Sequence, residues 1–132
     1  MGGYTHVSDG AEISDYVKLR GGVEVLGNAL LKGYFSLCDI MTISGDALIT
    51  SPFDVLNIYL GGSYGDEDTE ARISAFKSMD GVSIFSQGIF HGRLLSETYE
   101  DFYNETKQSA CLIDRKVFEK CCELIKVYFC IH

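Results

Sequence analysis

The sequence predicts a mainly β chain: a single-stranded parallel β-solenoid with triangular coils of 18 residues, followed by two C-terminal α-helices. The first observation is that Val, Ile or Leu occupies nine successive positions six residues apart, from Val7 to Val55. The second is that the third place of each hexad holds Asp, Gly, Ser or Asn, residues that turn a chain easily. The third is that residues 18 apart are alike, as in Ala11, Ala29 and Ala47, so that like side chains would stack in successive coils.

An α+β antiparallel sheet with a C-terminal helix is the alternative fold, because residues 41–49 also alternate in the way of a half-buried strand. Such a sheet gives no reason for nine apolar positions in phase. The six-residue spacing therefore favours the solenoid.

The predicted solenoid covers residues 7–95, and its rhythm breaks at a glycine-rich and acidic loop over residues 61–71. The acids of this loop are Asp66, Glu67, Asp68 and Glu70. They lack the alternating oxygen spacing of a calcium loop, so we expect a solvated loop that protrudes from a coil. Beyond it a shifted register fits in part, because Ile84 and Phe90 stand at opening places but so do Arg72 and Ser78.

After Leu95 the apolar period becomes helical, and residues 96–132 predict a helical cap. Ser96 is the expected N-cap of a short helix, and Asp114 that of a second helix over residues 115–129. The second helix has one wide apolar stripe. The stripe comprises Val117, Phe118, Cys121, Leu124, Ile125 and Tyr128. We expect the open end or a flat side of the solenoid to cover it.

Two hexads carry a family resemblance. Residues 25–30, Val-Leu-Gly-Asn-Ala-Leu, and residues 43–48, Ile-Ser-Gly-Asp-Ala-Leu, resemble the V-x-G-[DN]-A-x repeats of hexapeptide-repeat, left-handed β-helix proteins. Bactofilin-like polymer-forming proteins are a looser match. The resemblance spans about two thirds of the chain and implies either a scaffold protein or a trimeric acyltransferase with a catalytic histidine. His91 is the weak candidate for that histidine, by position only.

Composition and charge limit the partners. The 132 residues form one expected domain with net charge −8, and their Lys and Arg residues are scattered, which argues against nucleic acid. An acidic surface would suit a basic protein partner. Five cysteines without zinc spacing, no leader-like start and no membrane-length apolar run predict a cytoplasmic chain with neither metal nor cofactor nor membrane contact.

The predicted function is a non-catalytic interaction or assembly module, acting as a scaffold, an inhibitor or an immunity-type protein. Leucines on the outward faces of the predicted coils point to a partner, and the acidic loop could reach a neighbouring protomer. The leucines are Leu26, Leu30, Leu48 and Leu60. We expect a homo-oligomer, with the helices over one side of the solenoid. The alternative is a small acyltransferase-like enzyme that uses His91.

Overall fold

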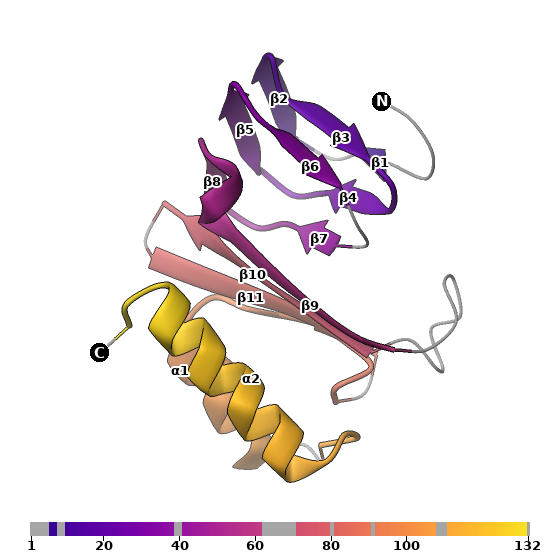
Figure 1. Cartoon of the computed structure of the whole chain (residues 1–132), viewed down its shortest axis with the longest axis vertical. Helices are drawn as coiled ribbons and strands as arrows, with labels where there is room; N and C mark the ends of the chain where they lie inside the picture. Colours follow the sequence, from indigo (N-terminus) through magenta and orange to yellow (C-terminus); the bar gives the residue numbers. More distant parts are fainter. Residues whose placement is uncertain are drawn as a thin grey trace.

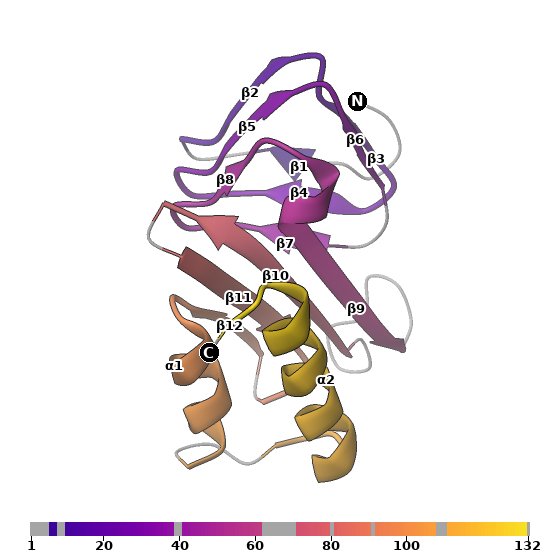
Figure 2. The ribbon, with the colours of Figure 1, turned by 60° about the vertical axis from the view of Figure 1, so that its left-hand side comes forward.

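The chain folds into three layers, which Figure 1 shows from top to bottom as short parallel strands, a four-stranded antiparallel sheet and two α-helices. Figure 2 shows the same order from another side, with the antiparallel sheet between the other two layers. The computed structural model describes residues 6–7, 10–38, 41–61, 71–79, 81–90, 92–107 and 111–131.

The first layer consists of eight short strands in three small, separate parallel sheets, with orders β1-β4-β7, β2-β5-β8 and β3-β6. The strands are β1 (His6–Val7), β2 (Glu12–Asp15), β3 (Lys18–Arg20), β4 (Val23–Val25), β5 (Leu30–Gly33), β6 (Ser36–Cys38), β7 (Met41–Ile43) and β8 (Leu48–Ile49). Partners in register are 18 residues apart, as in Val23 with Met41 and Leu30 with Leu48. We call this part of the molecule the parallel layer.

Successive corners of the parallel layer approach each other closely. Gly27 and Gly45 both have a φ of 66°, in the left-handed region that favours glycine. A Cβ added at Gly27 would lie 2.8 Å from the backbone nitrogen of Gly45. The corner at Gly27 therefore needs glycine for its space as well as for its dihedral angle.

A short 3₁₀ turn ends the parallel layer. Ser51 caps this turn, η1 (Pro52–Asp54), by accepting a hydrogen bond from the backbone N–H of Phe53 at 3.2 Å. Proline at the first turn position suits the fixed φ of its ring. Asp54 lies buried and accepts bonds from the backbone N–H and the hydroxyl of Thr50, while Lys77 lies 3.3 Å from its other oxygen. The turn directs the chain away from the corner and into the second layer.

The second layer is one antiparallel sheet with strand order β12-β11-β10-β9. Its strands are β9 (Val55–Gly61), β10 (Ala71–Ser78), β11 (Gly81–Gln87) and β12 (Arg93–Ser96). Side chains alternate between its two faces. Val55, Phe76 and Phe85 belong to the core shared with the parallel layer. Ile73 and Ile84 belong to the core under the helices.

The third layer holds α1 (Tyr99–Asn104), the short 3₁₀ turn η2 (Glu105–Lys107) and α2 (Arg115–Tyr128). Asp114 caps α2 by accepting a hydrogen bond from the backbone N–H of Lys116 at 2.8 Å. Phe90, Phe102 and Phe118 pack against one another with ring centroids 5.4 to 5.9 Å apart, and all three are buried. Neither described α-helix is long and apolar enough to cross a membrane.

The predicted solenoid over residues 7–95 is wrong. The described strands up to Ile49 fall into three separate small sheets, and from Val55 to Ser96 the strands run antiparallel. The last of the nine spaced residues, Val55, already lies in β9. The antiparallel alternative fits in part, since it gives the second layer and a C-terminal helix but omits the parallel sheets.

The predicted stacking columns fail beyond residue 51 for the same reason. Phe53 was expected to continue a buried column, but it lies on η1 with its side chain 77% exposed. Tyr59, expected above Met41, lies in β9 and pairs with Arg72. The shifted register beyond the acidic loop is also wrong, because Arg72 to Gln87 form the β10–β11 hairpin.

The helical cap is corrected in two respects. The helices pack on the antiparallel sheet, whose other face covers the parallel layer, so they cover no side of the predicted solenoid. The N-cap of the short helix is Thr98 and not Ser96, because Thr98 accepts from the backbone N–H of Asp101 and Ser96 still belongs to β12. The second helix begins after Asp114, as the sequence predicts, and ends at Tyr128.

Candidate functional site

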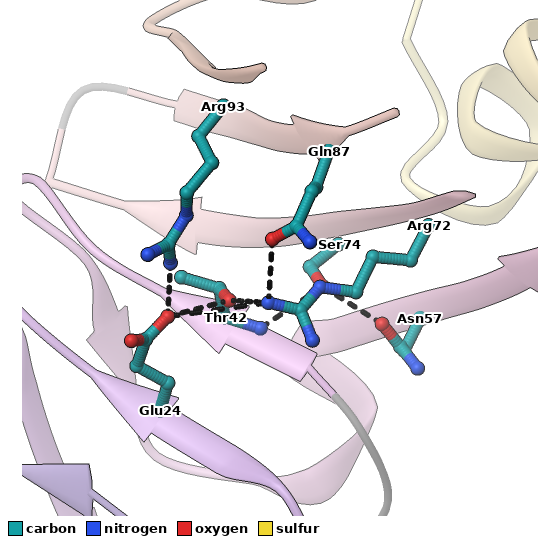
Figure 3. Close-up of polar contacts among 7 residues, drawn as sticks. All are labelled: Glu24, Thr42, Asn57, Arg72, Ser74, Gln87 and Arg93. Carbon is teal, nitrogen blue, oxygen red and sulfur yellow. Dashed lines mark hydrogen bonds and ion pairs between the residues drawn. The ribbon is translucent and has the colours of Figure 1, made fainter. Parts of the chain in front are cut away.

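A cluster of seven polar side chains lies where the parallel layer meets the antiparallel sheet (Figure 3). Its members are Glu24, Thr42, Asn57, Arg72, Ser74, Gln87 and Arg93. They come from β4, β7, β9, β10, β11 and β12, and therefore from two layers. We call this group the interlayer polar cluster.

Arg72 is the centre of the cluster. Its Nη2 donates to Thr42 Oγ1 at 2.8 Å and to Gln87 Oε1 at 3.3 Å, and it lies 4.0 Å from Glu24 Oε1. The Arg72 side chain is only 9% exposed. A guanidinium so deeply buried is tolerated when carboxylate and neutral acceptors surround it. Arg72 thus ties β10 to both β7 and β4.

Glu24 receives a second arginine. Arg93 forms an ion pair with Glu24 Oε1, and the Arg93 side chain is 36% exposed. The Thr42 hydroxyl donates to the same oxygen at 3.0 Å. Both guanidinium groups also lie over the ring of Phe85, at 5.8 Å for Arg72 and 5.0 Å for Arg93. The carboxylate is therefore held by two cations and one hydroxyl.

Ser74 connects the same layers through the backbone. Its Oγ donates to Asn57 Oδ1 at 2.7 Å and accepts from the Thr42 backbone N–H at 3.2 Å. Thr42 and Ser74 are both buried. The bond to the Thr42 amide occupies a backbone donor that no parallel strand takes up on that side.

The geometry of the interlayer polar cluster suits a structural joint. A nucleophilic serine needs a neighbouring base that accepts its proton, whereas the Ser74 hydroxyl bonds to an amide oxygen. A general base needs a lone pair available to substrate, whereas two arginines and a hydroxyl contact one oxygen of Glu24. We infer that the cluster fixes the two layers to each other.

The sequence gave one signal for this cluster that was not used. Arg72 stands at an opening place of the shifted register, where the repeat requires an apolar residue. A buried arginine demands an acid partner, and Glu24 and Thr42 are 18 residues apart, in register on β4 and β7. Their pairing with Arg72 could not be read without the antiparallel sheet.

A second feature is an apolar surface beside β9. The outer half of the α2 stripe remains exposed, with Leu124 at 48%, while Phe118, Cys121 and Ile125 are buried. An open groove of about 330 Å³ lies between α2 and β9. Its lining comprises Ile58, Lys116, Val117, Lys120, Cys121 and Leu124.

The apolar surface continues to the start of β9. The Tyr128 hydroxyl donates to the backbone oxygen of Phe53 at 2.9 Å, which places the end of α2 beside η1. Phe53 and Tyr128 are both exposed. We call the surface formed by Phe53, Ile58, Val117, Leu124 and Tyr128 the β9–α2 face.

A larger hollow of about 600 Å³ lies at the other end of the sheet, between the corner at Gly45 and the start of α1. Its walls include Leu95, Tyr99 and Ile131, and its acids are Asp46, Glu97 and Glu100. Lysine and arginine are absent from its described lining. Burial, with the nearby Cys122 thiol, raises the pKa of Tyr99, so this phenol stays neutral.

The cysteines do not form a redox or metal centre within the described part of the chain. Burial raises the pKa of Cys122 to about 12 and that of Cys121 in the same direction. Thiols with raised pKa values are poor nucleophiles and poor metal ligands. Among the described residues, no group of three His, Cys, Asp or Glu side chains has the arrangement of a metal site.

The predicted interaction residues fall in different places. Leu30 and Leu48 are neighbours in register on β5 and β8, and Leu26 lies half-buried in the preceding corner. Leu60 lies on β9 and packs against the helix-side core. The predicted candidates His91, Asp66, Glu67, Asp68 and Glu70 lie outside the described residues.

No protein-family model, curated protein or solved structure matches this chain. The resemblance to hexapeptide-repeat and bactofilin-like proteins is therefore withdrawn, since the sheet topology contradicts it as well.

Proposed function

We propose that this chain is a non-catalytic protein-interaction module and that the β9–α2 face is its binding surface. The observation that carries the proposal is the exposed half of the α2 stripe. Val117, Leu124 and Tyr128 repeat at helical spacing next to buried residues of the same helix, and they border an open groove against Ile58.

Such a surface is unusual for a chain that stays alone in water. Single exposed apolar residues are common on proteins, but a contiguous apolar patch rimmed by charges is typical of a docking site. Here Lys116 and Lys120 border the groove. Aliphatic and aromatic side chains next to long cationic ones provide the apolar centre and polar rim of a protein interface.

Site-specific photo-crosslinking tests the proposal. A photo-reactive amino acid in place of Leu124 should form a covalent adduct with a protein chain in the cells that produce this protein. The same amino acid in place of Met79, 62% exposed in the turn between β10 and β11, is the control and should form no comparable adduct. If the probe at position 124 is no more reactive toward protein than the probe at position 79, the β9–α2 face is no binding surface.

A further inference from the structure

We propose that the partner at the β9–α2 face is a second copy of this chain, joined by antiparallel pairing of β9 with β9 of the other copy. This inference rests on the proposed function and names its partner. Three features of the described residues support it: the edge position of β9, the place of α2 on the same sheet, and the charges along α2.

The edge at β9 differs from the other edges of the described sheets. β9 is the last strand of its sheet, pairs with β10, and runs for seven residues without a charged residue or proline. Strands β2, β3 and β12 are three or four residues long, and each carries at least one charged residue. Short length and charge are the usual protection against edge-to-edge pairing. β9 lacks both.

A second β9 continues the pattern of the sheet. Every described pairing in the second layer is antiparallel, so an antiparallel neighbour extends the same alternation. A strand that pairs antiparallel with its own copy does so across a twofold axis, and the contact is closed because each copy uses the same surface. The two sheets then become one continuous sheet.

The same axis brings the two α2 helices together. α2 lies on the sheet face that contains Leu56, Ile58 and Leu60, and it ends beside Phe53. Pairing along β9 therefore places the exposed stripes of both copies side by side. One contact covers both the sheet edge and the stripe, with Val117 and Leu124 at its centre.

The charges on α2 complement those of an antiparallel copy. Lys120 pairs with Glu123 at 3.3 Å, and both side chains are mostly exposed. In an antiparallel crossing centred between these residues, Lys120 of each copy faces Glu123 of the other copy. The contact itself is thus attractive, whereas the chain as a whole carries a net charge of −8 and two copies repel.

This combination predicts an unusual salt dependence. Added salt screens the repulsion between two acidic chains, so self-association should strengthen as ionic strength rises. A basic partner bound by electrostatic attraction would instead be released by salt. The sign of the salt effect therefore separates a second copy from a basic protein.

Sedimentation of the purified chain tests the proposal. Over a roughly thousandfold range of protein concentration, the mass should rise from 14.6 kDa toward twice that value, and the dimer should be more populated at high salt. Leu124→Asp should weaken the dimer by at least about tenfold. Met79→Asp, which adds the same charge outside the face, should leave the dimer no weaker than the charge alone makes it.

Hydrogen exchange of the unmodified chain provides a test that no folding defect can imitate. Amides of β9 should exchange more slowly at high protein concentration than at low concentration, while amides of α1 should not change. A chain that remains a monomer at all concentrations, or a β9 whose exchange ignores concentration, overturns the second copy.

The photo-crosslinking experiment separates this inference from the proposed function. An adduct of twice 14.6 kDa from the probe at position 124 supports the second copy. An adduct with a different protein, together with a monomer in sedimentation, overturns the second copy and leaves the interaction module standing. The absence of any adduct at position 124 overturns both.

Discussion

Arg72 Nη2 of β10 donates a 2.8 Å hydrogen bond to Thr42 Oγ1 of β7, and this bond joins two layers whose strands run in different arrangements. The parallel layer and the antiparallel sheet have an apolar core in common, formed in part by Phe76 and Phe85. Apolar contacts alone permit small sliding movements. A buried guanidinium with specific acceptors fixes one relative position, because any shift leaves a desolvated charge poorly paired.

Arg72→Ala should therefore destabilise the chain strongly. The substitution leaves Gln87 and Glu24 without the buried cation that contacts both, and we expect a loss of about 3 kcal/mol in the free energy of unfolding. Urea unfolding followed by far-UV circular dichroism measures it.

Arg93→Ala is the matched comparison. Arg93 pairs with the same carboxylate but is 36% exposed, so water can replace it, and we expect a loss of about 1 kcal/mol or less. Equal losses for the two variants would show that burial of Arg72 is not what matters in the interlayer polar cluster.

Gly27→Ala should destabilise the parallel layer more than its dihedral angle alone explains. The new Cβ would meet the Gly45 backbone nitrogen at 2.8 Å, and backbone cannot move aside cheaply. We expect about 2 kcal/mol or more, adding overlap to the usual cost of about 1 kcal/mol for alanine at a positive φ. Thermal unfolding by calorimetry provides the measurement.

Gly92→Ala isolates the conformational part of that cost. Gly92 has a similar φ of 71°, but a Cβ there meets nothing within 4 Å. We expect it to lose about 1 kcal/mol. A Gly92→Ala variant as unstable as Gly27→Ala would argue against close packing of successive corners.

The sequence predicted the local pairing better than the architecture. The 18-residue spacing is seen in the register of Leu30 with Leu48, but the single solenoid inferred from it is wrong. Val55 keeps the spacing of six and yet lies in an antiparallel strand. A buried strand and one side of a coil both require alternate apolar residues, so the spacing cannot distinguish them once a turn such as Pro52–Asp54 has redirected the chain.

The candidate sites were predictable to different degrees. The α2 stripe and its Asp114 cap follow directly from helical spacing, and the sequence indicated that so wide a stripe needs a cover. Which half of the stripe stays exposed depends on where the antiparallel sheet lies. The contacts of Arg72 depend on two layers 30 or more residues apart in the chain, and no local pattern encodes them.

The unfolding free energy should fall as the pH rises above 9, in part because of Cys122. Burial raises the pKa of this thiol from 9.0 to about 12. Below pH 9 both states keep the proton, so its contribution to stability is fully present. Between pH 9 and 12 the unfolded state loses the proton and the folded state keeps it, so stability falls by about 1.4 kcal/mol per pH unit from this group.

Cys122→Ala removes this titration and gives the measurement its control. Urea unfolding under reducing conditions at pH 8 and at about pH 10.5 should show a steeper loss for the unmodified chain than for the variant, by about 2 kcal/mol over that interval. The variant also begins from a lower stability at pH 8, because the buried sulfur leaves a small cavity. Only the difference in slope reports the proton, and parallel pH profiles for the two chains would mean that the Cys122 thiol ionises as readily when folded as when unfolded.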